Sequence, residues 1–287
     1  MNGRVVVVTG AGQGLGRAHA LALAAAGAHV VVNDLGPAAG TVAAEIRDLG
    51  GTAIAHSCDV SDFTAAGKLV GTAVAHFGRL DALVNNAGVN RDRMLVTMSE
   101  QEWDDAVRIN LKGCFAPLRH AAAHWREQAK AGAPVAARVV NTSSGAGLMG
   151  SVGQANYSAA KAGIAALTVV AAAELARYGV TVNAIAPTAR TPMTERVFAG
   201  RMRAPASGFD AMDPANVSPL VVWLASADSG EVTGRMFEVE GGTVSLADGW
   251  RHGPAVTRDG RWEPGELGGA VRDLLAAAPA PVPVYGA

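Results

Sequence analysis

The sequence contains little cysteine and almost no excess charge. Its 287 residues include 2 cysteines, and 24 basic against 25 acidic side chains leave a net charge of −1. Because so few cysteines exclude a disulfide framework and fit a reducing compartment, we interpret Cys58 and Cys114 as buried thiols. A net charge near zero provides no overall field that recruits nucleic acid or an anionic membrane, and it still allows a local basic pocket.

Long hydrophobic runs are also missing. No stretch of about 18 apolar residues is free of charge, so we expect no membrane span. The first apolar run, residues 5–8, is too short for the core of a secretory signal, and it leads directly into glycines. These features predict a soluble, cytoplasmic protein. With 49% hydrophobic and 17% charged residues, the chain can bury the core of one large domain.

Short β-branched runs alternate with longer alanine-rich helical runs. Strands are expected at residues 4–9, 29–33, 53–57, 81–84, 138–142, 180–185 and 236–239. Helices are expected at residues 15–26, 38–49, 65–76, 100–130, 155–178 and 214–225, and Gly241-Gly242 is expected to form a turn after the last strand. The alternation predicts an α/β fold: a single Rossmann-type, doubly wound, parallel seven-stranded sheet with helices on both faces, at residues 1–247.

Residues 248–287 are expected to form a C-terminal extension with a short helix at 266–277. Disordered tails rarely carry so many large apolar side chains, so we favour a packed extension over a frayed end. Trp250 and Trp262 are expected to anchor it. The side chains expected to pack on a neighbouring subunit, and to border its substrate pocket, are Leu274, Leu275, Val282, Val284 and Tyr285.

A glycine-rich turn follows the first predicted strand and opens the first helix. It reads Gly10-Ala11-Gly12-Gln13-Gly14-Leu15-Gly16. Glycines let the backbone approach a pyrophosphate, whose charge the helix N-terminus favours, although any tight turn between a strand and a helix also needs glycine. Asp34, at the end of the second strand, is placed to bind ribose hydroxyls and to repel a 2′-phosphate. The residues after Asp34 supply no arginine and Gln13 is uncharged, so the sequence favours NAD over NADP.

A second group of chemically suggestive residues lies in the middle of the chain. Tyr157 and Lys161 are one helical turn apart, which by itself is typical of a solvated helix face. Ser144 follows the predicted strand 138–142, at the sheet edge where parallel strands present ligand-binding groups. Asn110 lies in the long helix before that strand. His120 and His124 could share a metal, but no acidic or cysteine ligand is near them in sequence, and we predict no metal site.

Taken together and in this order, these segments resemble those of the short-chain dehydrogenase/reductase family over residues 4–245. The matching segments are Thr9–Gly16 of the glycine-rich turn, Asp34, Cys58-Asp59-Val60, Asn85-Asn86-Ala87-Gly88, Asn110, Ser143-Ser144, Tyr157-Ser-Ala-Ala-Lys161 and Asn183-Ala-Ile-Ala-Pro187. Any one of them is a weak signal, whereas the ordered set is highly specific. The resemblance implies an oxidoreductase that moves a hydride between a nicotinamide cofactor and a secondary alcohol or ketone.

The resemblance also implies a role for each matching residue. Tyr157 would be the general acid/base, Ser144 would bind the substrate oxygen, Lys161 would lower the pKa of the tyrosine and hold the nicotinamide ribose, and Asn110 would anchor a water. The residues implied in cofactor binding are Gly10, Gln13, Gly14, Leu15, Gly16, Asp34, Asp59, Val60, Asn86, Ala87, Gly88, Tyr157, Lys161, Pro187 and Thr191. Most members of this family are homotetramers, and we expect the same assembly.

The segment after the sixth predicted strand narrows the resemblance. Thr188 stands where the commonest family pattern has glycine, and one residue fewer precedes Thr191-Pro-Met193. This short form is similar to the dehydrogenase part of multifunctional enzyme type 2 and its bacterial relatives, which implies a (3R)-3-hydroxyacyl-CoA substrate, some with steroid-derived chains. A 3-ketoacyl carrier-protein reductase and a hydroxysteroid dehydrogenase are alternatives. A noncatalytic dinucleotide sensor is a remote one, because such proteins commonly lose the tyrosine or the lysine.

Overall fold

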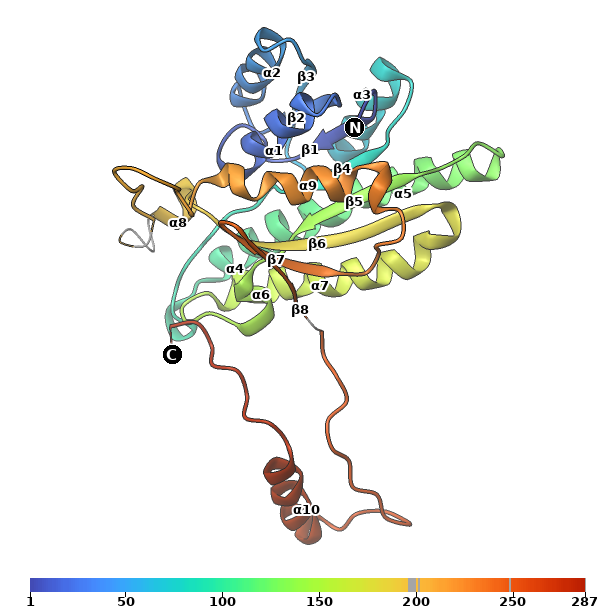
Figure 1. Cartoon of the computed structure of the whole chain (residues 1–287). Helices are drawn as coiled ribbons and strands as arrows, with labels where there is room; N and C mark the ends of the chain where they lie inside the picture. The colour runs from blue at the N-terminus through green and yellow to red at the C-terminus, as the bar shows by residue number, and fades with distance from the viewer. Residues whose placement is uncertain (196–199, 201, 248, 287) are drawn as a thin grey trace.

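The computed structural model describes residues 1–195, 200, 202–247 and 249–286. One sheet forms the centre of the molecule, in the strand order β3-β2-β1-β4-β5-β6-β7-β8 (Figure 1). Its strands are β1 (Val5–Val8), β2 (His29–Asp34), β3 (Thr52–Ser57), β4 (Ala82–Asn85), β5 (Ala137–Thr142), β6 (Val180–Thr188), β7 (Met236–Glu240) and β8 (Thr243–Ala247). Pairings from β3 through β7 are parallel, which confirms the predicted doubly wound sheet.

The eighth strand was not predicted. β8 pairs antiparallel with β7, and Gly241-Gly242 forms the tight turn that was expected there. Val244 and Leu246 in β8 are 53% and 58% exposed, so this edge strand lacks the buried apolar run that marks the central strands. The sheet therefore has eight strands rather than seven.

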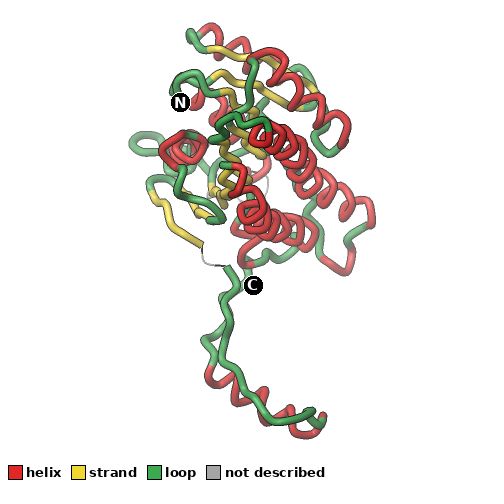
Figure 2. The backbone as a smooth tube through the Cα atoms, turned by 90° about the vertical axis from the view of Figure 1, so that its right-hand side faces the viewer, coloured by secondary structure: helices red, strands yellow, loops and turns green. Residues whose placement is uncertain are grey.

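Helices cover both faces of the sheet (Figure 2). On one face lie α1 (Gly14–Ala25), α2 (Ala38–Asp48) and α9 (Ser218–Ala225), and on the other lie α3 (Phe63–Phe77), α5 (Gly113–Lys130) and α7 (Ala155–Leu175). The remaining α-helices are α4 (Glu100–Ala106), α6 (Gly145–Met149), α8 (Pro192–Glu195) and α10 (Pro264–Ala277). Short 3-10 turns lie at η1 (Leu95–Thr97), η3 (Ala176–Tyr178), η4 (Pro214–Asn216) and η5 (Ala227–Ser229).

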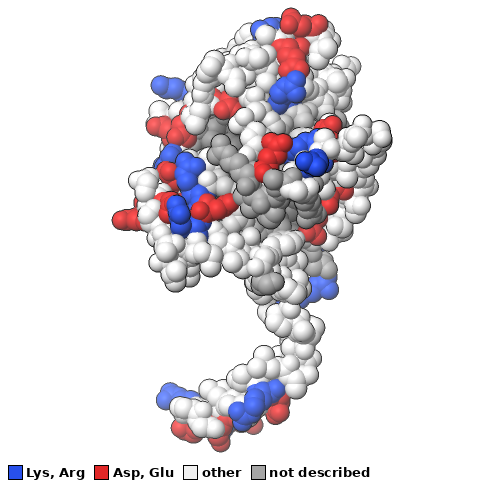
Figure 3. All heavy atoms as spheres, turned by 90° about the vertical axis from the view of Figure 1, so that its left-hand side faces the viewer, with Lys and Arg blue, Asp and Glu red and all other residues white. Residues whose placement is uncertain are grey.

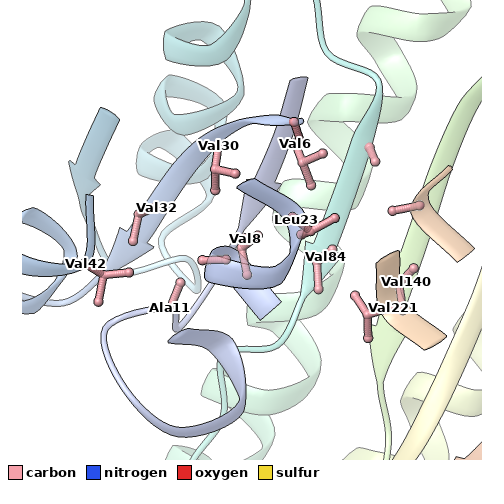
Figure 4. Packing of buried hydrophobic residues seen from close by; sticks show 14 of the residues in the cluster. Val6, Val8, Ala11, Leu23, Val30, Val32, Val42, Val84, Val140 and Val221 are labelled. Atoms are coloured by element: carbon pink, nitrogen blue, oxygen red, sulfur yellow. The ribbon is translucent and has the colours of Figure 1, made fainter. Parts of the chain in front are cut away.

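The valines of the central strands explain why the sheet is covered on both sides. Val6 and Val8 of β1 pack with Leu23 of α1, whereas Val5 and Val7 point to the opposite face (Figure 4). All four are at most 1% exposed. Because successive side chains of a strand alternate between faces, a continuous valine run requires an apolar layer on each side.

The helix predicted over residues 100–130 is one continuous path with a change of winding. α4 begins with the capping box formed by Ser99 and Glu102, and α5 ends the path at Lys130. Between them η2 (Val107–Lys112) is a π-helix, a conformation that is frequent at functional sites. This segment contains Asn110, so the departure from the prediction falls on a residue of the candidate site.

One segment, Ala155–Tyr178, is long and apolar enough to cross a membrane by length and composition alone. It is α7 with the turn η3, and its side chains Ala171 and Ala172 are part of the core under β5 and β6. Core helices pass the same test, and this helix belongs to the folded core.

The C-terminal extension leaves the body after β8 and later returns to it (Figures 1 and 2). Asp248 and Ala287, the first and last residues of the predicted extension, lie outside the described residues. α10 confirms the helix expected at 266–277, and each of its residues is exposed or half-buried. Trp250 is fully exposed in this chain, so it does not anchor the extension to the chain's own body. Figure 3 shows that the far end of the extension carries charges of both signs.

The end of the extension lies on the chain's own body. Tyr285 pairs with Ser151 in a parallel bridge beside α6. The packing on a neighbouring subunit that the sequence predicts for Leu274, Leu275 and Val282 stays a prediction.

Candidate active site

The glycine-rich turn lies where the strand order reverses, between β1 and β4. Gly10 has φ +60°, and a Cβ there would lie 2.7 Å from the Cα of Ala87. A Cβ at Gly16 would lie 2.1 Å from the carbonyl oxygen of Gly10. Side chains at these positions are therefore excluded by backbone, which leaves a bare cradle at the N-terminus of α1. Such a cradle, with the unpaired N–H groups of the first helical turn, fits a pyrophosphate.

Asn86 acts inside the loops rather than toward a ligand. Its side-chain amide donates to the carbonyl oxygens of Thr9 and Gly10, both at 3.1 Å. The hydroxyl of Thr9 accepts the backbone N–H groups of Asn86 and Ala87, at 3.0 and 3.1 Å. These bonds fix the loop after β4 against the loop after β1. Thr9 was not singled out from the sequence, although its place before the first glycine was part of the matched segment.

The Asp34 carboxylate lies over the glycine-rich turn. One oxygen accepts the backbone N–H of Gly12 at 2.8 Å, and the other accepts that of Leu35 at 2.7 Å. The side chain is half-buried, so the remaining lone pairs of both oxygens can accept hydroxyl donors. Two cations of the adjoining helices are engaged elsewhere: Arg17 pairs with Glu45, and Arg47 donates to the carbonyl of Ala53.

Asp59 and Val60 follow β3, the strand that pairs with β2 and its last residue, Asp34. Asp59 accepts bonds from the backbone and hydroxyl of Ser61 and from Arg108, which together hold its pKa below the usual value against the effect of burial. The Val60 side chain is 4% exposed and packs in the core. Only the backbone of Val60 is therefore free to contact a cofactor, which refines the role expected from the sequence.

The segment after β6 forms the other wall of the cradle. β6 extends through Pro187 to Thr188, and Thr188 pairs with Glu240 of β7. Thr188 is thus extended, and no glycine is needed at this position. Thr191 then lies beside the glycine-rich turn, where its methyl group is 3.4 Å from the Cβ position of Gly14.

Ser144, Tyr157 and Lys161 meet at the carboxyl end of β5. Ser144 caps α6 by accepting the N–H of Ala146 at 3.2 Å, and it is also a hydrogen-bond partner of Tyr157. The ammonium group of Lys161 donates to the carbonyl of Thr142 at 2.8 Å and lies 5.4 Å from the ring centre of Tyr157. The hydroxyl of Ser143 donates to the carbonyl of Lys161 at 2.8 Å, which ties α7 to β5.

Burial dominates the titration of this group. It raises the pKa of Tyr157 to about 12, and the hydrogen bond with Ser144 opposes this shift. Burial also lowers the pKa of Lys161 to about 8. The tyrosine is thus protonated at neutral pH in the chain alone, and a further positive charge beside it would favour the phenolate.

Asn110 is fully buried in the π-helical turn. Its side-chain amide donates to the carbonyls of Val89 and Ala106, at 2.8 and 2.9 Å, and its oxygen accepts the N–H of Val89 at 3.3 Å. A Cβ at Gly88 would lie 2.5 Å from this oxygen and 3.5 Å from the ammonium group of Lys161. The side chain therefore holds the loop after β4 close to Lys161.

In the part of the chain that the structure describes, no group of three or more His, Cys, Asp or Glu side chains could hold a metal ion. The Nε2–H of His120 donates to the carbonyl of Phe63 at 2.8 Å, and the His120 ring lies against the Phe63 ring. Burial lowers the pKa of His124, the other histidine considered as a metal ligand, below its usual value.

The chain is similar in sequence and in structure to several known proteins. A family model described as short chain dehydrogenase matches residues 4–201. The hydroxyacyl-CoA dehydrogenase ChsB1 of Mycobacterium tuberculosis is 48% identical, over 96% of this chain and 90% of that protein. The peroxisomal multifunctional enzyme type 2 of Mus musculus is 44% identical over 85% of this chain but only 32% of that protein. A crystal structure of a short chain dehydrogenase from Mycobacterium avium is 57% identical, with a TM-score of 0.93 over 100% of this chain and 99% of that one.

Proposed function

The chain belongs to the short-chain dehydrogenase family and is an oxidoreductase acting on CH–OH groups, and we propose that it oxidises 3-hydroxyacyl-CoA thioesters with NAD. The observation that supports this most is the joint presence of a glycine cradle and of Ser144, Tyr157 and Lys161 at one sheet edge. This complete set also disfavours a noncatalytic dinucleotide sensor.

The proton chemistry follows from the chain's own residues. When bound, a nicotinamide would supply the hydride chemistry at the substrate carbon, and the residues of this chain move the proton at the substrate oxygen. In oxidation, the phenolate of Tyr157 accepts the hydroxyl proton as the C–H bond breaks and the C=O bond forms. Ser144 binds the same oxygen and stabilises the charge that develops on it. The ammonium group of Lys161 favours the phenolate before the proton is taken, and in reduction the steps reverse.

NAD is proposed over NADP because of Asp34. Its oxygens already accept two backbone N–H groups, so the carboxylate is held in place with acceptor capacity left for ribose hydroxyls. A 2′-phosphate at that position would meet a fixed negative charge. The engagement of Arg17 with Glu45 leaves that arginine paired on the surface rather than beside Asp34.

The substrate class is supported by the relatives. ChsB1 carries a hydroxyacyl-CoA dehydrogenase name and aligns with nearly the whole chain, whereas the chain spans about a third of multifunctional enzyme type 2. The test is NAD reduction by the purified protein with (3R)-3-hydroxyacyl-CoAs, hydroxysteroids and small secondary alcohols. Preference for the acyl-CoAs supports the proposal, and activity confined to another alcohol contradicts it. Faster ketone reduction with NADPH and acyl carrier protein would favour the carrier-protein reductase.

We also propose a homotetramer in the cytoplasm. Large apolar side chains are exposed on the two long helices of one face: Phe115 on α5, and Val169 and Val170 on α7, are 42%, 58% and 53% exposed. Such a patch fits an interface between copies. The two free thiols fit a reducing compartment. Light scattering at working concentration tests the assembly, and a stable monomer would contradict it.

A further inference from the structure

The last residues of the chain lie beside the catalytic serine. The backbone N–H of Tyr285 donates to the carbonyl of Gly150 at 3.3 Å, and its carbonyl accepts the N–H of Val152 at 2.9 Å. Tyr285 thereby extends the segment 150–152 as a short parallel pair. This segment connects α6, which Ser144 caps, with α7, which carries Tyr157. The chain end is thus bound to the loop that holds the two hydroxyl groups of the site.

Two side chains of the chain end fill space that glycines leave open. A Cβ at Gly145 would lie 3.0 Å from both Cε2 and the hydroxyl oxygen of Tyr285, and a Cβ at Gly150 would lie 3.3 Å from Val284. The ring of Tyr285 therefore packs on the residue directly after Ser144. Because Ser144 binds the substrate oxygen in the proposed function, the ring packs one residue away from the group that would hold that oxygen.

These side chains are only partly covered. Tyr285 is 49% exposed and Val284 is 40% exposed, although their backbone is paired and their inner sides are packed. An ordered, half-open apolar surface beside a catalytic group is suited to the apolar part of a substrate, which would cover it on binding. The alignment with the solved short chain dehydrogenase spans 100% of this chain, so the extension has a counterpart there.

We propose that Val284 and Tyr285 form a wall of the substrate pocket and determine which acyl chain the enzyme accepts. The inference rests on the proposed function, since it assigns these residues to the acyl group next to the reacting carbon. The extension thus delivers a specificity determinant from the end of the chain to a site whose other parts lie before residue 195. Its occupant is the acyl chain of the substrate.

The first test compares kcat/KM over a series of 3-hydroxyacyl-CoAs of increasing length, with secondary alcohols included. Tyr285→Ala should change the ratio between long and short chains by roughly 10-fold or more, because apolar pocket contacts discriminate on that scale. Tyr285→Phe should keep the wild-type ratio. Val282→Ala is the matched control, since Val282 is 63% exposed and lies in the same strand-like end. The dissociation constant of NAD should be unchanged in all three, which also shows that they fold.

An unaltered chain-length profile in Tyr285→Ala, with the wild type active, would overturn the inference and leave the proposed function intact. If the wild type acts only on a non-acyl alcohol of the panel, the proposed function fails. The same variants are then compared on that alcohol. Equal kcat/KM in all of them would overturn the assignment of Val284 and Tyr285 to the substrate pocket.

The second test places the chain end independently of activity. Ser151 and Tyr285 are opposed in the parallel bridge, and neighbouring strands lie about 4.8 Å apart, which is within the Cα–Cα range of a disulfide. In the double variant Ser151→Cys/Tyr285→Cys, mild oxidation should give a disulfide within one chain, which denaturing gels and thiol counting distinguish from one between chains. A disulfide only between chains, or none, would overturn the placement on the chain's own site.

Discussion

The two ends of the site are built in different ways. At the cofactor end, backbone meets backbone: Gly10 lies against Ala87, Gly16 against the carbonyl of Gly10, and Asp34 accepts the N–H of Gly12. At the substrate end, a loop of glycines is completed by side chains from the far end of the chain, Val284 and Tyr285. The cofactor end is rigid because its close backbone contacts leave no room for side chains at the glycines. The substrate end depends on a segment that leaves the body and returns. The difference teaches that cofactor binding is a property of the sheet, whereas the extent of the substrate pocket is a property of the extension.

The largest expected effect lies where the two ends meet. Tyr157→Phe removes the transferable proton and keeps the ring, so turnover should fall roughly 100- to 10,000-fold, the usual contribution of general acid–base catalysis. NAD binding should be nearly unchanged, because the cradle does not involve the hydroxyl. Steady-state kinetics and NAD titration measure both quantities. A loss below about 10-fold would show that another group carries the proton.

The next effect is a change of pH dependence. In oxidation the phenolate is the active form, so kcat/KM should rise with pH as Tyr157 loses its proton. Lys161 favours that form while it is charged, and burial has lowered its own pKa to about 8 in the chain alone. Lys161→Met should therefore move the rising part of the profile to higher pH by about 1 to 3 units, the range typical of a nearby opposite charge.

The measurement is kcat/KM against pH for oxidation, with thermal melting as the check on folding. Reduction needs the protonated phenol and should show the opposite slope. A variant with lower activity but an unmoved profile would indicate that Lys161 positions the cofactor and does not tune the tyrosine.

The division between the cofactor end and the substrate end also separates what the sequence predicts from what it does not. The glycines and Asp34 were predicted because their positions follow a motif, a strand followed by a turn and a helix with an acidic residue ending the next strand, although the contact of Gly10 with Ala87 is long-range. Asn110 was placed in the right element, but its π-helical turn was not foreseen, since the pattern over 100–130 reads as one helix. The contact of Tyr285 with Gly145 could not be predicted, because the surface to which a chain end returns depends on the whole path of the extension.

The next effect is expected at Asp34, which belongs to the cofactor end of the site. Asp34→Ala removes acceptors for the ribose hydroxyls and relieves repulsion of a 2′-phosphate, so NAD should bind roughly 10- to 100-fold more weakly, the scale of hydrogen bonds to a charged group. NADP should be affected less or bind better. Asp34→Asn keeps an acceptor without the charge, and should improve NADP while weakening NAD less than alanine does. Kinetics with both cofactors decide, and a wild-type preference for NADP would refute the proposed cofactor.

The smallest effect on turnover at neutral pH is expected at the buried contact between α1 and α9, behind the cofactor end. His19 of α1 is fully buried, and its Nδ1 lies 3.0 Å from the hydroxyl of Ser218 in α9. Burial lowers the pKa of His19 to about 3, whereas the unfolded chain has the usual value near 6.5. Between these values the unfolded state binds a proton that the folded state does not. The free energy of unfolding should therefore fall as pH falls through this range, by up to about 1.4 kcal/mol per pH unit from this residue.

His19→Asn keeps a polar group at the position of Nδ1 and removes the titration. The difference in unfolding free energy between wild type and variant, measured by urea denaturation from pH 7 to pH 4, should thus shift steadily in favour of the variant as pH falls. Ser218→Ala is the matched control, because it removes the hydrogen-bond partner and leaves the histidine, so its difference from wild type should change little with pH. Because His19 stays neutral in the folded state over this range, the NAD affinity of the folded protein should depend on pH in the same way in the wild type and in His19→Asn. Equal pH slopes of the unfolding free energy in wild type and His19→Asn would mean that α1 tolerates a charged His19, and the rigidity ascribed to the cofactor end would then not extend to the packing behind it.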